Sequence, residues 1–205
     1  MTIGLLVDLL IGLAIGYVVV SETEIPRLQQ RIEALESQLA DRDSQIAYLE
    51  SQLSRLKGQA NITVLGVYFS PRGGCEDQAI YWISRANKSI HILIYSFTLD
   101  SIGDALIEAH GKGVEVMIVF EKSQISRYSQ YQRLRTAGIY VRNDTNPRLM
   151  HHKVMIIDEI VVLTGSFNWS KNAEKYNNEN LIIIKDTYVA EIYEEMFQKI
   201  WDESI

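Results

Sequence analysis

Residues 150–170 place a histidine, a lysine, a serine and an asparagine in one short segment that is rich in β-branched residues. Two apolar runs within this segment predict a hairpin of core strands over 154–164. Side chains alternate along a strand, so His151 and Lys153 should share one face while His152 points to the other. An imidazole and an ammonium on one face could meet the same phosphate, the imidazole as nucleophile and the ammonium neutralising an oxygen.

More polar residues surround this hairpin. A turn-forming run after the second strand should bring the Ser166 hydroxyl and the Asn168 carboxamide back toward the histidine. Glu179 precedes a further apolar strand, where its carboxylate could hold the histidine ring by its second nitrogen. Asp158 lies in the hairpin turn and could either join the site or cap its own hairpin. We expect His152, on the opposite face, to be packed or hydrogen-bonded.

The spacing of these residues resembles the HKD motif of the phospholipase D superfamily: His151-x-Lys153, four residues, Asp158, six residues, then Gly165-Ser166-x-Asn168. The resemblance extends from about Val67 to the C-terminus. It is strongest to the single-motif branch, in the runs AGIYVRNDTNPRLMHHK and NNENLIII. That branch includes the bacterial Nuc-type endonucleases and the Zucchini-like mitochondrial cardiolipin hydrolases.

The resemblance implies a role for each matching residue. His151 would be the nucleophile that forms a phosphohistidine, and the same histidine of a second copy would protonate the leaving oxygen. Lys153 and Asn168 would bind the phosphate oxygens, Ser166 would support the loop or the phosphate, and Glu179 would orient the imidazole. The lysine and the carboxamide would supply the charge stabilisation, so no metal or other cofactor is expected.

The composition fits one globular domain with an N-terminal extension. The chain has 205 residues, 47% of them hydrophobic, and a formal net charge of −6. Cys75 is the only cysteine, which excludes disulfides within the chain and zinc clusters built from several thiolates. The negative net charge alone argues against nucleic-acid binding, but the distribution of charge carries more weight than the sum.

Residues 122–153 carry seven basic side chains against one acidic one and lead directly into the histidine segment. Tyrosines at 128, 131 and 140 lie among them. The stretch is either a solvated helix face or a surface that follows a phosphate backbone, and we favour the second because it adjoins the site. The predicted nucleic-acid contacts are Lys122, Arg127, Arg133, Arg135, Arg142 and Arg148.

The N-terminus predicts a membrane anchor over 1–21. Residues 3–20 form an apolar run with one charge, Asp8, and no basic residue precedes it as in a signal peptide. Gly12 and Gly16 form a small-xxx-small pair, which is either a helix-pairing stripe or coincidence. Basic residues directly after the run favour a cytoplasmic position for the domain that follows.

Residues 22–58 carry a heptad pattern that predicts a parallel two-stranded coiled coil. The pattern is regular over more than four heptads, which disfavours a helix packed on its own domain. Arg42 interrupts the seam. The seam positions are Ile25, Ile32, Leu39, Ile46 and Leu53 at a, and Leu28, Leu35, Arg42, Leu49 and Leu56 at d. A single site histidine, this seam and the small-residue stripe all favour a homodimer.

Residues 61–205 alternate between strand and helix patterns, which predicts a layered α/β domain with a mixed sheet flanked by helices. Besides the hairpin, the expected strands are 62–69, 90–95, 114–120, 139–142 and 181–184, and the expected helices are 76–86, 101–110, 124–137 and 188–201.

The sequence therefore predicts a membrane-anchored, homodimeric phosphodiesterase. The favoured activity is metal-independent cleavage of DNA or RNA. The first alternative is a phospholipase D or cardiolipin hydrolase acting on membrane phospholipid, and the second is a membrane scaffold without activity.

Overall fold

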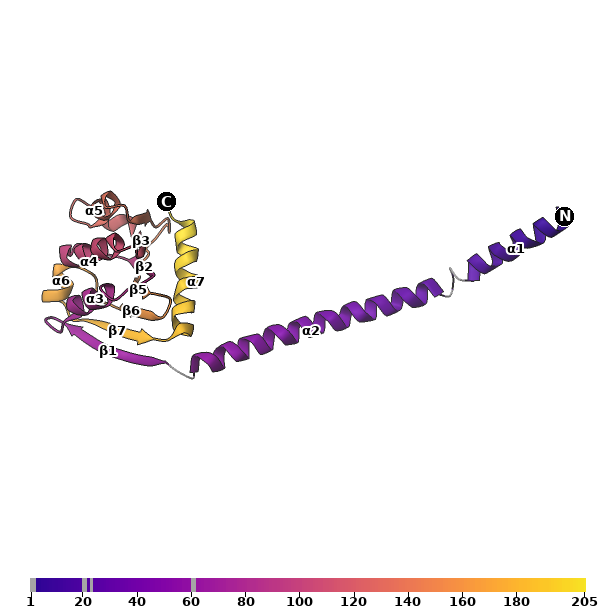
Figure 1. Cartoon of the computed structure of the whole chain (residues 1–205), viewed down its shortest axis with the longest axis horizontal. Coiled ribbons are helices and arrows are strands. Elements are labelled where there is room, and N and C mark those ends of the chain that lie inside the picture. Colours follow the sequence, from indigo (N-terminus) through magenta and orange to yellow (C-terminus); the bar gives the residue numbers. More distant parts are fainter. Residues whose placement is uncertain (1–2, 20–21, 23, 60–61) are drawn as a thin grey trace. The chain divides into compact units, whose positions relative to one another are not determined.

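The computed structural model describes residues 3–19, 22, 24–59 and 62–205. From residue 62 onward the chain forms a seven-stranded sheet flanked by helices, which confirms the predicted layered α/β fold (Figure 1). In chain order its elements are β1 (Thr63–Ser70), α3 (Cys75–Ile83), β2 (Ser89–Ile94), α4 (Asp100–Gly111), β3 (Glu115–Phe120), the 3₁₀ turn η2 (Lys122–Gln124), α5 (Tyr131–Thr136), β4 (Tyr140–Asn143), β5 (Lys153–Ile157), β6 (Val161–Gly165), α6 (Lys171–Lys175), β7 (Glu179–Lys185) and α7 (Thr187–Glu203).

The strand order is β1-β7-β6-β5-β2-β3-β4. The strands β2, β3 and β4 are parallel, whereas β5 is antiparallel to β2, and β6, β7 and β1 alternate in direction beyond it. The starts of β5 and β7 and the ends of β2 and β6 therefore lie at one edge of the sheet. We call this the site edge, because the segments that carry the predicted site residues meet there.

The β5–β6 hairpin has a local cause. Its turn residues, Asp158 and Glu159, both have positive φ, 53° and 58°. Two consecutive positive φ angles suit the tight turn of a hairpin, and aspartate tolerates that conformation better than most residues. The turn fixes the pairing of Val154 with Thr164 and so sets which side chains of both strands face the core.

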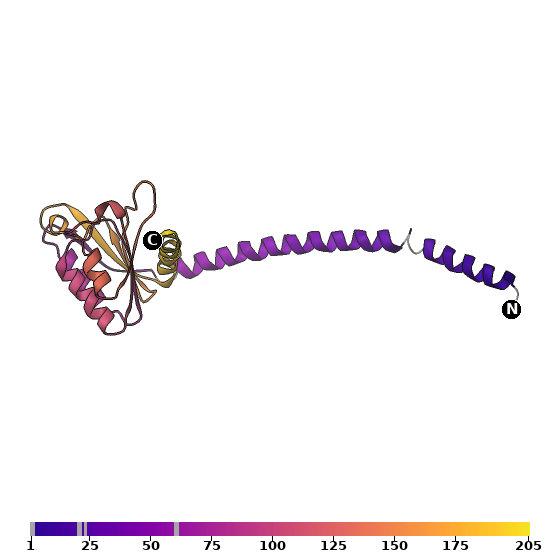
Figure 2. The ribbon, with the colours of Figure 1, turned by 90° about the horizontal axis from the view of Figure 1, so that it is seen from above.

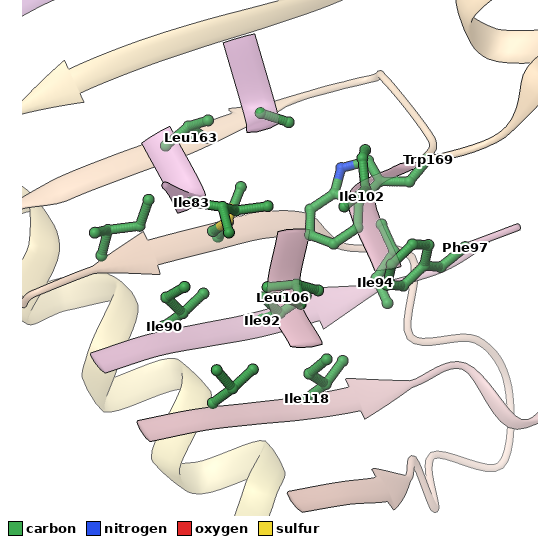
Figure 3. Packing of buried hydrophobic residues seen from close by; sticks show 14 of the residues in the cluster. Ile83, Ile90, Ile92, Ile94, Phe97, Ile102, Leu106, Ile118, Leu163 and Trp169 are labelled. Carbon is green, nitrogen blue, oxygen red and sulfur yellow. The ribbon is translucent and has the colours of Figure 1, made fainter. Parts of the chain in front are cut away.

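Two apolar layers cover the sheet. Helices α3, α4 and α5 pack on one face, where Ile90, Ile92 and Ile94 of β2 meet Ile102 and Leu106 of α4 (Figure 3). Helix α7 packs on the other face, against side chains that alternate with the first set (Figure 2, α7 in yellow). Successive side chains of a strand point to opposite faces, so a sheet covered on both sides buries both sets.

One predicted element is wrong. The helix expected over 124–137 is replaced by η2, an irregular loop and the short helix α5. Serine side chains explain the difference: the Ser126 hydroxyl accepts from the amide of Tyr128, and the Ser129 hydroxyl donates to the carbonyl of Ser126. Such local bonds compete with helix hydrogen bonds.

The N-terminal part contains α1 (Ile3–Val19) and α2 (Ile25–Gln59). No helix among the described residues combines the length and the hydropathy that a membrane crossing requires. The single-pass anchor predicted over 1–21 is thus not supported: α1 has 17 residues, and Val20, the last residue of the apolar run, lies outside the described residues.

Helix α2 coincides with the predicted heptad segment and continues one residue past Gly58. Its described seam side chains are exposed, between 46% and 62%: Ile25, Leu28, Ile32, Leu35, Leu39, Ile46, Leu49 and Leu53. The side chain of Leu56 lies outside the described residues. Pairing with a second helix remains a prediction.

Candidate active site

His151 and Lys153 lie together at the site edge, as the alternation of side chains along the strand predicts. The Lys153 Nζ is 3.1 Å from the His151 Nδ1 and donates to the His151 carbonyl at 2.9 Å. The imidazole is exposed, whereas Lys153 is only 7% exposed. A fixed cation beside an accessible imidazole is the arrangement that nucleophilic attack on a phosphate requires.

The two side chains line a pocket of about 520 Å³, together with Ser166, Asn168 and Glu179. Burial lowers the pKa of Lys153, and the nearby Glu179 carboxylate opposes this shift. The ammonium has few polar partners in this setting, so a bound phosphate would gain a strong charge-assisted interaction with it. The pocket is therefore suited to an anion.

The turn after β6 closes one side of the pocket. A side chain at Gly165 would place its Cβ 2.2 Å from the Asn180 carbonyl, so this position requires glycine. The same carbonyl accepts from the amides of Ser166 and Phe167, at 3.1 and 3.2 Å. These contacts tie the turn to the start of β7 and hold Asn168 at the pocket. Among the described residues, the buried Asn168 Oδ1 has no hydrogen-bond partner.

Glu179 does not contact the histidine as expected. Its carboxylate accepts from the Ser166 hydroxyl at 2.6 Å and from the Asn177 side chain at 3.0 Å, and in the described part of the chain it makes no hydrogen bond to His151. β6 separates β7 from β5, which places their backbones about 10 Å apart, and the Glu179 carboxylate is bonded to Ser166 and Asn177 on its own side of the pocket. Within one chain, the Glu179 carboxylate therefore supports the Ser166 loop. Its hydrogen bonds do not orient the His151 ring.

Two residues that the sequence did not reveal support the site. The Tyr95 ring packs edge-on against His151, with centroids 4.3 Å apart, and lies 4.8 Å from the Lys153 Nζ. The fully buried Glu121 accepts from the amide of Met150 at 2.7 Å and so fixes the backbone just before the histidine. Both follow core strands directly, but only the strand order brings them to His151.

The sequence profile described as "Cardiolipin synthase, PLD-like domain" matches residues 80–201, which include this whole pocket. The chain belongs to this phospholipase D-like family. The crystal structure of a phospholipase D family member, Nuc from Salmonella typhimurium, superposes with a TM-score of 0.67 at 35% sequence identity, covering 71% of this chain and 97% of that one.

Curated phospholipase D-like relatives are similar over a shorter region. A mitochondrial cardiolipin hydrolase from Chlamydomonas reinhardtii is 37% identical over 122 residues, which is 59% of this chain and 55% of the relative. A phospholipase D from Rickettsia prowazekii is 40% identical over 126 residues, 61% of this chain and 62% of the relative. The chain thus spans little more than half the length of these relatives.

Asp158, the aspartate of the motif, is not at the site. It follows the far end of β5, about 17 Å along the strand from Lys153 at ~3.4 Å per residue. Its carboxylate accepts from the amides of Asn87, Lys88 and Ser89, at 2.7 to 3.1 Å. Burial raises its pKa, but these hydrogen bonds outweigh burial and lower it overall. In this phospholipase D-like domain Asp158 caps the loop before β2 and does not belong to the catalytic set.

We therefore expect Asp158→Asn to lower the free energy of unfolding by about 1–2 kcal/mol at pH 7, because charge-assisted hydrogen bonds are lost. Since the folded-state pKa is lowered, the carboxylate stabilises the fold above its unfolded pKa and loses this effect as the pH falls below about 4. Urea unfolding of both proteins at pH 7 and pH 3.5 checks this. A difference in stability that is the same at both pH values would contradict the assignment.

The six predicted basic contacts do not form one surface. The Arg142 guanidinium donates to the Trp201 carbonyl at 2.7 Å and lies over the ring of that residue, against α7. Arg133 forms ion pairs with Asp104 and, at 3.9 Å, with Asp100. Both guanidinium groups therefore already have partners within the domain. They are not free to bind phosphates, as had been expected.

The other four basic side chains are exposed. Lys122, Arg127 and Arg148 belong to the loops that follow β3 and precede β5, at the site edge, whereas Arg135 lies on α5. The Lys122 Nζ donates to the Asn146 carbonyl, and Arg127 lies 4.6 Å from the Tyr128 ring. Of the six predicted contacts, three are thus exposed at the site edge.

His152 was expected to be packed or hydrogen-bonded, and its ring is covered only in part. Its side chain is exposed and lines a second pocket on the other side of His151. Burial and then the charges of Lys153 and His151 lower its pKa, with Asp144 opposing them. These effects favour the neutral form of the His152 imidazole.

Proposed function

We propose that this protein is a phosphodiesterase that uses His151 as its nucleophile. The observation that supports this most strongly is the Lys153 Nζ at 3.1 Å from the His151 Nδ1, with both side chains lining one pocket. His151 attacks phosphorus, the P–O bond to the leaving group breaks, and a phosphohistidine forms. Water then attacks this intermediate, which releases the phosphate monoester and the free imidazole. Lys153 and the Asn168 side-chain amide, which would donate through its Nδ2, would hold the non-bridging oxygens.

The reaction also needs a proton donor for the leaving oxygen, and a homodimer would supply it. His152 is close, but burial and the charges of Lys153 and His151 lower its pKa and so disfavour its protonated form. A neutral imidazole is a poor general acid. We infer that His151 of a second copy is the donor, which the exposure of His151 permits.

The exposed seam of α2 supports the same dimer. Eight large apolar side chains at heptad spacing are exposed on this helix. Isoleucine at most a positions and leucine at most d positions favour a parallel two-stranded coiled coil. Such a seam would bring two copies of the chain together at low concentration.

We favour a nucleic acid as the substrate. Lys122, Arg127 and Arg148 are exposed in loops at the site edge, where they could contact phosphates next to the scissile one. The names of two relatives, a mitochondrial cardiolipin hydrolase and a phospholipase D, favour a phospholipid instead, and this is the second candidate.

Product release from four substrates separates the two candidates. Purified protein is incubated in EDTA with single-stranded DNA, RNA, duplex DNA and cardiolipin vesicles, beside the His151→Ala variant. The proposal predicts cleavage of a nucleic acid that is lost in the variant. Release from cardiolipin alone would replace the nuclease by a phospholipase, and no cleavage of any substrate would reject both.

The paired imidazoles predict a bell-shaped dependence of kcat/KM on pH. One histidine must be neutral to attack and its counterpart must be protonated, so the pair must share one proton. The rate should therefore fall on both sides of a maximum near neutral pH. Initial rates between pH 5 and 9 test this, and a flat profile would argue against two coupled histidines.

A further inference from the structure

A second pocket, of about 390 Å³, opens on the other side of His151. Its walls come from the loop between β4 and β5 and from the end of α7. His151 lines both this pocket and the pocket of about 520 Å³ that contains Lys153. A diester whose phosphate lies beside Lys153 would thus direct one of its two ester substituents into the second pocket.

Hydrogen bonds hold the walls of this pocket in place. The Thr145 hydroxyl donates to the Glu203 carbonyl at 2.7 Å, which joins the loop to α7. The Asp144 carboxylate accepts from the Asn146 amide at 3.1 Å, and Glu121 accepts from Met150 at 2.7 Å. The pocket is therefore already formed before a ligand binds.

The lining combines polar edges with apolar walls. Asp144, Asn146, His152 and Glu203 offer hydrogen-bonding groups, and Met150 is among the apolar residues beside them. Two carboxylates disfavour a second phosphate, and the number of polar groups disfavours an acyl chain. A flat heterocycle with a polar edge suits this lining, because its faces can pack and its edge can hydrogen-bond.

We propose that this pocket binds the base of the nucleotide next to the scissile phosphate, with a preference for a base that carries an exocyclic amine. The amine would donate to the carboxylates, with the exposed Glu203 as the accessible acceptor. The neutral imidazole of His152 would pack against the ring. This inference rests on the proposed nuclease function and adds a specificity site to it.

Dinucleotides with a single phosphodiester test the pocket. The base is removed from one side or the other, and kcat/KM is compared with that of the intact dinucleotide. In the wild type, loss of the base on one side should lower kcat/KM about 10-fold, a typical value for one base contact. In His152→Ala the same removal should have an effect of less than about 2-fold.

The amine preference has its own matched pair of variants. Cytosine carries an amine at the position where uracil carries an oxygen. We expect a dinucleotide with cytosine on the pocket side to be cleaved about 5-fold faster than one with uracil, which is the effect of about one hydrogen bond. Glu203→Gln should bring this ratio close to 1. The control is Glu195→Gln, which should keep the ratio, because Glu195 is also exposed on α7 but lies outside this pocket. An unchanged ratio in Glu203→Gln would overturn the preference.

Bis(p-nitrophenyl) phosphate separates this inference from the proposed function, because it is a diester without a base. Cleavage of this compound and of dinucleotides, with no effect of base removal on either side, would overturn the base pocket alone. Failure to cleave any diester would instead overturn the nuclease. If Glu203→Gln slowed release only from an amine-bearing phospholipid, the pocket would belong to a lipid headgroup and the inference would be wrong.

Discussion

Replacing His151 by alanine should reduce turnover of a phosphodiester by about 10⁴-fold or more. In the proposed mechanism the effect is large because one residue would serve twice: as the nucleophile in one copy and as the acid for the leaving group in the other. The imidazole is exposed, so its removal should leave the fold intact. Initial rates on single-stranded DNA, with circular dichroism to verify folding, measure the loss.

Asp158→Asn is the matched control for this variant. Both residues belong to the same motif, but Asp158 lies at the opposite end of β5 and bonds the 87–89 loop. Activity per folded molecule should therefore be retained in Asp158→Asn. Retention of more than about 1% of the activity in His151→Ala would contradict the nucleophile assignment, since removal of a nucleophile costs far more.

Replacing Lys153 by methionine should lower kcat by about 10²- to 10³-fold, because the charge that faces the developing phosphate charge is removed. Methionine keeps most of the volume of this buried side chain. Leaving out a buried ammonium removes a desolvation cost, so the melting temperature should stay equal or rise. Rates on a small diester and thermal unfolding together measure both effects.

The pH dependence of the Lys153 variant adds a second check. The pKa of Lys153 is lowered by burial, so activity that depends on the ammonium should decline as the pH rises through this lowered pKa. Lys153→Met should lack this alkaline decline, apart from the contribution of the histidines. A loss of rate that merely follows a loss of folded protein would assign Lys153 a structural role.

The strand pattern of the sequence predicted the fold well, because the burial of a sheet leaves a periodic record in the chain. The hairpin over 154–164 and the shared face of His151 and Lys153 follow from that period alone. The helix expected over 124–137 was wrong, since the hydroxyls of Ser126 and Ser129 close local turns there.

The contacts of the site depend on strand order, which no local pattern records. Tyr95 meets His151 because β2 pairs with β5, across nearly sixty residues of sequence. The Glu179 carboxylate bonds Ser166 and Asn177 and makes no hydrogen bond to His151 in the described part of the chain, a choice of partners that the motif spacing does not reveal. Asp158 fits the motif spacing, yet that spacing carries it past the strand to the far end of the sheet.

Co-expression of wild-type chains with His151→Ala chains tests whether two copies share one reaction centre. If each site needs both histidines, an equal mixture of freely associating chains should keep about a quarter of the wild-type activity, and the purified heterodimer should be inactive. If each copy works alone, the mixture should keep about half, and a half-active heterodimer would contradict the shared site.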